Sequence, residues 1–214
     1  MSYRSVVAAA LSGAPLRQLS YWRSSRSSEA PLLAPALHKS RSRVSYSFRD
    51  VVALRAFVYL RSREVPLQRV RKAVQSLRDM GATEHLSSYQ LVAVGRDVVW
   101  KVSDQVAVDL TRSPGQQVIA QMVDILAAFH GIQDREVVPL YHPKPGVAVD
   151  PEIRGGYPVI VETRVPYDLI ASLLDDGVNA EEVAGFYPAV SPDAARGAVA
   201  FARYIDSYRE PVGA

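Results

Sequence analysis

The amino-acid sequence predicts a mainly α-helical protein with small β elements. Apolar residues recur every three or four positions before residue 81 and after residue 166, which is typical of helices. Between about residues 89 and 110 they recur at every second position, which is typical of strands. The 214 residues are 48% hydrophobic with a mean hydropathy of -0.01, so the chain can bury a core. We divide it into three segments: residues 1–81, 84–140 and 150–214.

Two short helices are expected first. Residues 4–11 have a helical composition that Ser12-Gly13 ends. Pro15 suits the first position of a second helix, because its missing N–H would have no partner there. In that helix, apolar side chains at helical spacing form one stripe: Leu16, Leu19 and Trp22. A basic stretch with alternating side chains, residues 38–46, suits a short β-ribbon.

Two further helices complete the first segment. Ser47 and Asp50 match a capping box, in which side chains and backbone N–H groups at a helix start bond one another. Pro66 begins the next helix and Gly81 ends it. Together, the helix, tight turn, second helix and ribbon are the elements of a winged helix-turn-helix.

The charge of the chain is unevenly distributed. Residues 1–80 contain 15 Lys or Arg and 4 Asp or Glu, a balance of +11. Residues 81–214 contain 10 and 18, a balance of -8, so the net charge of +3 hides the division. A basic first part suits a polyanion such as nucleic acid, and an acidic remainder is repelled by one.

These features predict DNA binding by the first segment. A helix with polar outward side chains fits the major groove, and a ribbon follows the phosphate backbone or enters the minor groove. The expected DNA contacts lie on the second helix and on the ribbon: Arg17, Gln18, Tyr21, Arg23, Lys39, Arg41 and Arg43. The alternative is a helical domain with an incidental basic face.

Three stretches of the first segment follow a family pattern. They are Gly13-x-x-x-Arg17-x-Leu19-x-Tyr21-Trp22, Tyr46-Ser-Phe-Arg-Asp50-Val-Val-Ala-Leu54 and Val65-Pro-Leu-Gln-Arg-Val-Arg-Lys-Ala-Val74. Over about residues 3–80 the chain thereby resembles MerR-like regulators. The resemblance implies that Arg17 and Tyr21 contact DNA, while Leu19 and Trp22 hold the helix down. Ser20 departs from the family, which usually has Arg there. The chain also lacks the long dimerisation helix and a cysteine effector site, which disfavours metal or redox sensing.

The middle segment is expected to be a small α+β connector. Strands are predicted at Leu91–Val94, Val98–Val102 and Val106–Leu110, and a helix at Gln116–Phe129. Because proteins that read DNA half-sites are usually two-fold symmetric, these strands are candidates for a homodimer interface. The proline-containing stretch 138–151 is expected to link the connector to the last segment.

The last segment is expected to be a trihelical domain with a short strand. Its most specific stretch is Gly155-Gly156-x-Pro158-x-Ile160-x-Glu162-Thr163-Arg164-Val165-Pro166, followed by Tyr187-Pro188. Over about residues 150–208 the chain resembles a small uncharacterised bacterial domain family, which often has Gly at the position of Glu162. The resemblance implies an antitoxin of the VapB type, whose partner is a PIN-type ribonuclease toxin.

A protein-binding role is expected for this domain. Residues 150–214 contain 5 Lys or Arg and 11 Asp or Glu, which makes them a poor reader of DNA. The last helix has more aromatic and apolar side chains than one buried stripe needs, and aromatic residues are enriched at interfaces. The expected partner-binding residues are Phe201, Arg203, Tyr204, Tyr208 and Arg209, with both arginines directed at the acidic metal site of the nuclease. The alternative is that the aromatic side chains complete the core.

No catalytic, metal or cofactor site is expected. The chain has no cysteine and four scattered histidines, and it contains no P-loop, G-x-S-x-G or G-x-G-x-x-G motif. No run approaches the roughly 18 apolar residues that a membrane span needs, so a cytoplasmic protein is expected.

The sequence therefore predicts an antitoxin of a type II toxin–antitoxin pair. It would bind a PIN-type ribonuclease and repress its own operon by binding operator DNA. The alternative is a stand-alone MerR-like repressor whose C-terminal domain senses a ligand or a protein. A third reading is an interaction scaffold that binds no DNA.

Overall fold

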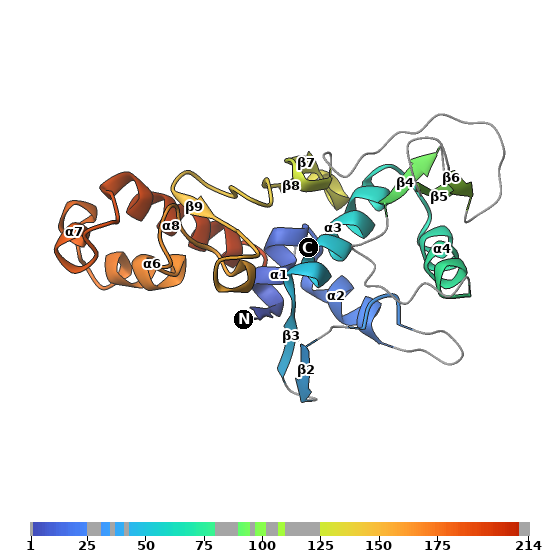
Figure 1. Ribbon diagram of the computed structural model, residues 1–214, viewed down its shortest axis with the longest axis horizontal. Helices are drawn as coiled ribbons and strands as arrows, with labels where there is room; N and C mark the ends of the chain where they lie inside the picture. The colour runs from blue at the N-terminus through green and yellow to red at the C-terminus, as the bar shows by residue number, and fades with distance from the viewer. Residues whose placement is uncertain are drawn as a thin grey trace.

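The structure is a computed structural model that describes residues 2–24, 31–34, 37–40, 43–79, 90–94, 97–101, 107–109 and 125–209. The helices are α1 (Ser5–Ser12), α2 (Leu16–Arg23), α3 (Phe48–Ser62), α4 (Leu67–Asp79), α6 (Tyr167–Asp175), α7 (Val183–Phe186) and α8 (Pro192–Asp206). The strands are β1 (Tyr3–Arg4), β2 (Leu37–Ser40), β3 (Arg43–Tyr46), β4 (Gln90–Val94), β5 (Asp97–Lys101), β6 (Ala107–Asp109), β7 (Phe129–His130), β8 (Glu136–Val137), β9 (Val147–Ala148) and β10 (Val159–Ile160). The predicted fold class, mainly helical with small antiparallel elements, is confirmed (Figure 1).

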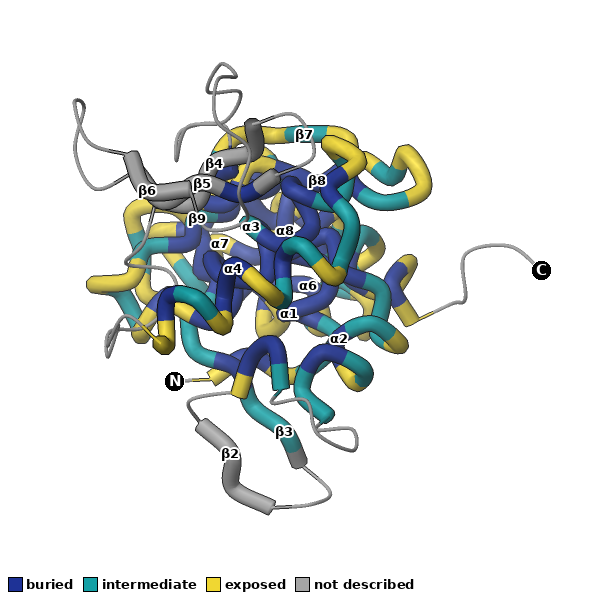
Figure 2. Tube along the Cα trace, turned by 90° about the vertical axis from the view of Figure 1, so that its right-hand side faces the viewer, coloured by how far each residue is buried: buried dark blue, intermediate teal, exposed yellow. Residues whose placement is uncertain are grey.

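The first two helices and a three-stranded sheet form the expected winged helix-turn-helix. The sheet has the strand order β1-β3-β2, with Tyr3 opposite Tyr46. Its β2–β3 hairpin projects from the body of the molecule on the side of α2, as Figures 1 and 2 both show. Gly13 makes the turn between the helices, with a φ of 80° and its N–H bonded to the carbonyl oxygen of Ala9. A Cβ there would lie 2.4 Å from Cγ2 of Val137, so the turn requires glycine.

Helix α3 begins as the sequence predicts. The Ser47 hydroxyl accepts from the Asp50 N–H at 3.1 Å, and the Asp50 carboxylate accepts from the Ser47 N–H at 2.7 Å, which completes the capping box. Most residues from Asp50 to Leu60 are buried, because α1, α4 and β7 pack around this helix. A helix buried on most of its faces is central to a fold rather than attached to its surface.

The middle segment contains a three-stranded antiparallel sheet in the order β4-β5-β6. These strands confirm the three that the sequence predicts, to within a few residues at their ends. Most of the expected helix at 116–129 lies outside the described residues, and its last residue, Phe129, belongs to β7.

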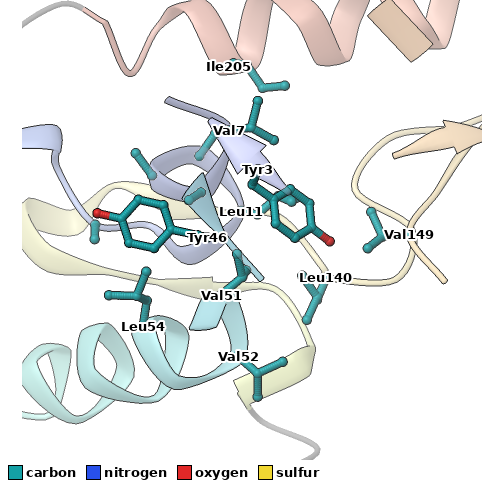
Figure 3. Packing of buried hydrophobic residues seen from close by; sticks show 14 of the residues in the cluster. Tyr3, Val7, Leu11, Tyr46, Val51, Val52, Leu54, Leu140, Val149 and Ile205 are labelled. Atoms are coloured by element: carbon teal, nitrogen blue, oxygen red, sulfur yellow. The ribbon is translucent and has the colours of Figure 1, made fainter. Parts of the chain in front are cut away.

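We call residues 147–209 the C-terminal unit. Within it, α6 and the β9–β10 pair pack against α8, and α8 packs in turn against α1. Figure 3 shows Val7 of α1 in one cluster with Leu140 and Ile205. The stretch 138–151 is therefore part of a shared core rather than the exposed linker that its prolines suggest.

The carboxyl end of α1 is buried and receives hydrogen bonds from two other helices. The last carbonyl groups of a helix have no partner within that helix, so buried ones need donors from elsewhere. The carbonyl of Ala10 accepts from the Tyr204 hydroxyl of α8 at 3.1 Å. The carbonyl of Leu11 accepts from the Arg55 guanidinium of α3. The first helix is thus joined to both α3 and the C-terminal unit at one point.

Arg55 is itself fully buried. Its Nε donates to the carbonyl of Ile125 at 2.7 Å, Nη1 to that of Val138 at 3.0 Å and Nη2 to that of Ala127 at 2.8 Å. The guanidinium carbon lies 5.1 Å from the centroid of the Phe129 ring. Burial lowers the pKa of Arg55 to about 10, so the side chain stays charged at neutral pH. Among the described residues, carbonyl dipoles and the ring rather than a carboxylate stabilise this charge.

Replacing Arg55 by Met is expected to lower the free energy of unfolding by about 3–5 kcal/mol, because several buried carbonyls lose their donor at once. Urea denaturation followed by circular dichroism measures this change. The control is Arg63→Met, which removes an exposed guanidinium 5.1 Å from the Tyr59 ring centroid and is expected to cost less than about 1 kcal/mol. Equal effects of the two substitutions would contradict the role given to Arg55.

Burial raises the pKa of six tyrosines: Tyr3, Tyr46, Tyr157, Tyr167, Tyr204 and Tyr208. A tyrosine of this kind keeps its proton in the folded state at a pH at which the unfolded chain has lost it. Its contribution to stability is complete below pH 10 and declines as the pH rises above that value. The lowered pKa of Arg55 makes the free energy of unfolding rise with pH instead, but Arg55 is one group against six tyrosines.

We therefore expect the free energy of unfolding to fall steeply above about pH 10. A fully buried tyrosine such as Tyr3 contributes about 1.4 kcal/mol per pH unit to the decline. Urea denaturation between about pH 7 and 11 measures the slope, and absorbance of tyrosinate follows ionisation in parallel. A free energy of unfolding that stays constant through this range would contradict the prediction.

Candidate nucleic-acid interface

Helix α2 has one face in the core and one in solvent. Leu19 and Trp22 are buried, and the Trp22 ring meets the ring of Phe57 edge-on with centroids 5.9 Å apart. Arg17 and Ser20 are exposed. The burial of Leu19 and Trp22 agrees with their expected role as anchors, and it fixes the orientation in which Arg17 faces outward.

Tyr21 is half-buried because α4 covers part of it. The Arg71 guanidinium carbon lies 5.3 Å from the centroid of the Tyr21 ring. This contact places a second cation beside the exposed face of α2 and limits the movement of the tyrosine. Tyr21 and Arg17 are therefore presented together by the packing of α2 against α3 and α4.

Two of the expected contacts on α2 are less exposed than predicted. The amide oxygen of Gln18 is buried without a hydrogen-bond partner among the described residues, so it faces the body of the molecule. Arg23 is half-buried beside Tyr46, where its charge opposes the rise that burial causes in the pKa of the Tyr46 hydroxyl. Of the four predicted contacts on this helix, only Arg17 is fully exposed.

The hairpin carries the remaining predicted contacts. Lys39 lies in β2 and Arg43 in β3, but the description of these two residues stops at the backbone. Arg41 lies outside the described residues. The strands themselves confirm the ribbon, whose register brings Ser40 opposite Arg43.

Other exposed cations near the sheet were not singled out from the sequence. Arg4 in β1 and Arg49 in the first turn of α3 are exposed, and neither forms an ion pair with a carboxylate among the described residues. Only the overall balance of +11 in residues 1–80 pointed to them. A helix with an outward arginine beside a projecting hairpin is the geometry that places one element in the major groove and the other along the phosphate backbone.

The prediction that the aromatic residues of the last helix form a partner-binding surface is wrong for Phe201 of α8 and for Tyr208, which follows α8. Both are buried, and Phe201 lies edge-on to Tyr167 with centroids 4.8 Å apart. Tyr204 is half-buried with its hydroxyl on α1. This helix has more aromatic residues than one buried stripe needs because it packs against two neighbours, α6 and α1. Arg203 and Arg209 are exposed, and Arg209 pairs with Asp206 at 2.8 Å.

The C-terminal unit instead exposes a different aromatic residue. Phe186 in α7 is 63% exposed, more than any other large hydrophobic side chain among the described residues. Exposed carboxylates precede it at Glu181 and Glu182. Figure 1 places α7 at the opposite end of the molecule from α4. Phe186 could not be singled out from the sequence, since a single phenylalanine in a one-turn helix gives no periodic signal.

Among the described residues, no group of three or more His, Asp or Glu side chains is arranged to hold a metal ion. No helix within the described ranges combines the length and apolar character that a membrane span requires.

Two family models match the chain. The model described as MerR HTH family regulatory protein matches residues 3–77. The model described as protein of unknown function (DUF433) matches residues 147–202. The two resemblances expected from the sequence are confirmed for these domains, and the assignment to VapB-type antitoxins stays a prediction.

The chain is also similar to curated proteins and to a solved structure. The uncharacterized HTH-type transcriptional regulators Rv1830 of Mycobacterium tuberculosis and Mb1861 of Mycobacterium bovis are each 30% identical to it over 142 residues. These matches cover 61% of this chain and 60% of each relative, so the chain spans about three fifths of their length. The crystal structure of Rv2018 from Mycobacterium tuberculosis is 17% identical, with a TM-score of 0.55 over 92% of this chain and 96% of that one. This likeness shows a shared fold.

The two faces of α2 give opposite expectations for substitution. Arg17→Ala is expected to weaken binding to duplex DNA by about tenfold and to leave the free energy of unfolding unchanged, because the side chain is exposed. Trp22→Ala is expected to lower the free energy of unfolding by about 3–5 kcal/mol. Fluorescence anisotropy with a labelled duplex and urea denaturation measure the two effects, with Arg203→Ala as the exposed control. Loss of stability in Arg17→Ala, or unchanged DNA affinity, would contradict the assignment.

Proposed function

From the MerR-family helix-turn-helix domain at residues 3–77, we infer that the protein is a DNA-binding transcriptional regulator. The observation that carries this proposal is α2, held by the buried Trp22 so that Arg17 faces solvent beside the projecting hairpin. The balance of +11 in residues 1–80 supports it, because each phosphate neutralised by Lys or Arg adds affinity. The two mycobacterial relatives are described as HTH-type transcriptional regulators, which agrees with this function.

We further propose that the regulator is the antitoxin of a type II toxin–antitoxin pair. In this proposal it acts in the cytoplasm without catalytic activity or a cofactor, binds a PIN-type ribonuclease and represses its own operon as a homodimer on operator DNA. The C-terminal unit supports a protein partner at its α7 end, because the exposed Glu181 and Glu182 would repel DNA there. The side chains proposed to meet the partner lie at two places: Phe186 with its acidic neighbours at α7, and the exposed Arg203 and Arg209 at the other end of α8.

A stand-alone repressor is the second candidate, and a groove in the structure favours it. The groove has a volume of about 410 Å³ and lies between residues 136–147 and Val161. Lys144 lines it, and its ammonium lies 5.5 Å from the ring centroid of Tyr204, whose hydroxyl bonds α1. A small molecule in this groove would contact Lys144, which packs against Tyr204 of α8. Helix α8 in turn packs against α1 of the winged helix.

Binding to DNA itself is tested by anisotropy titration of a labelled duplex from the region upstream of the reading frame. We expect the affinity to fall by at least tenfold between about 50 and 200 mM salt, because phosphate contacts release counterions. A duplex of unrelated sequence, titrated in parallel, separates specific from non-specific binding. Absence of binding at low salt would refute the proposal of a DNA-binding regulator and favour an interaction scaffold.

The antitoxin is tested by co-expression with the product of the neighbouring reading frame. We expect the two proteins to purify as a complex, and Phe186→Ser to weaken the complex by about tenfold or more, because exposed aromatic residues dominate many interfaces. The matched control is Tyr141→Ser, which alters another exposed aromatic side chain, stacked on Phe48. If the wild-type protein forms no complex, the antitoxin proposal is refuted and the stand-alone repressor is the remaining candidate.

A further inference from the structure

The C-terminal unit meets the winged helix through a loop that lies directly on β1. The Tyr3 hydroxyl donates to the carbonyl of Gly156, and the rings of Tyr3 and Tyr157 are stacked with centroids 6.4 Å apart. Gly156 has a φ of 85°, and a Cβ there would lie 2.7 Å from the Tyr3 hydroxyl and 2.8 Å from Cδ2 of Phe48. This close approach fixes the position of residues 154–164 relative to the sheet.

Two of the five cations of the C-terminal unit belong to this loop. Nη1 of Arg154 donates to the carbonyl of Arg164 at 3.4 Å, and Arg164 is exposed. Neither arginine forms an ion pair with a carboxylate among the described residues. The nearby Asp168 accepts instead from the Tyr157 hydroxyl at 2.8 Å. Nε of Arg154 is buried and has no hydrogen-bond partner in the described structure.

Two of the three other cations of the unit pair with its own carboxylates among the described residues, and Arg203 does not. Arg196 pairs with both Glu181 and Asp193 at 2.8 Å. Arg209 pairs with Asp206 at the same distance. The loop arginines, which form no such pair among the described residues, differ from Arg203 in their place: they lie where the acidic domain touches the basic one.

The loop lies beside the exposed cations of the winged helix. In the sheet order β1-β3-β2, Arg4 of β1 lies opposite Ser45 of β3 and is exposed. Arg49 follows Phe48, the residue that contacts Gly156, and is exposed as well. Exposed arginines thus lie on β1, at the start of α3 and on the loop of the C-terminal unit, where the exposed Glu152 and Glu162 accompany them. Figure 1 shows the acidic α7 end of that unit pointing away from the hairpin.

We propose that Arg154 and Arg164 extend the DNA-binding surface from the winged helix onto the C-terminal unit by contacting backbone phosphates. This inference rests on the proposed DNA binding and adds a contact outside the helix-turn-helix domain. The guanidinium group suits a phosphate because it offers several donors in a planar arrangement that matches two oxygens. Phosphate contacts position a protein on DNA without reading its sequence, so the added contact strengthens binding to any duplex.

The test is an anisotropy titration over about 50 to 200 mM salt, with one labelled duplex from the upstream region and one of unrelated sequence. The double variant Arg154→Gln/Arg164→Gln is expected to raise the dissociation constant by roughly tenfold on both duplexes. It is also expected to reduce the slope of log affinity against log salt by about 1.8, which corresponds to two phosphates. Arg164→Gln alone, at an exposed position that tolerates substitution, is expected to reduce the slope by about 0.9.

The matched control for Arg164→Gln is Arg196→Gln, which also removes one positive charge but does so near the α7 end. It is expected to keep the wild-type slope. Equal slopes for wild type and the loop variants would overturn this inference and leave the proposed regulator intact, as would an equal effect of Arg196→Gln. If the wild-type protein binds neither duplex, both this inference and the proposed DNA-binding function are overturned.

Discussion

The buried carboxyl end of α1 is the constraint on which the rest of the structure depends. Its last carbonyls cannot reach water, so they need donors from other helices. Arg55 of α3 and Tyr204 of α8 supply them, and the same guanidinium bonds Ile125, Ala127 and Val138. One buried cation therefore joins the first helix, the central helix and the segment that leads to the C-terminal unit. Without it, several buried acceptors would lose their partner together.

Helix α3, which Arg55 holds in place, also positions α2. Phe57, two residues after Arg55, packs against Trp22 in a T-shaped arrangement and so helps to set the orientation of α2. On the other side of α1, Tyr3 of the sheet is bonded to the C-terminal unit at Gly156. Helix α2, the hairpin and the C-terminal unit thus share one core, so a partner bound to the C-terminal unit would act on a structure continuous with α2.

Local signals made much of this fold predictable from the sequence. The capping box at Ser47, the glycine turn and the basic ribbon each depend on neighbouring residues. Long-range contacts were not predictable: arginine is almost never fully buried, so nothing marked Arg55. The rings of Phe201 and Tyr208 were assigned to a partner because the second neighbour of α8, helix α1, cannot be seen in a sequence. Glu162 was noted as a departure from a family glycine, and its φ of 59° explains why glycine is common there.

Hydrogen–deuterium exchange of the whole protein, with and without an upstream duplex, tests the central claim most directly, namely that α2, the hairpin and the adjoining loop form one DNA-binding surface. The account predicts slower exchange on DNA in residues 16–23, 37–46 and 154–164, and unchanged exchange in residues 181–189 around α7. Protection confined to the C-terminal unit around α7, with none in α2, would contradict it.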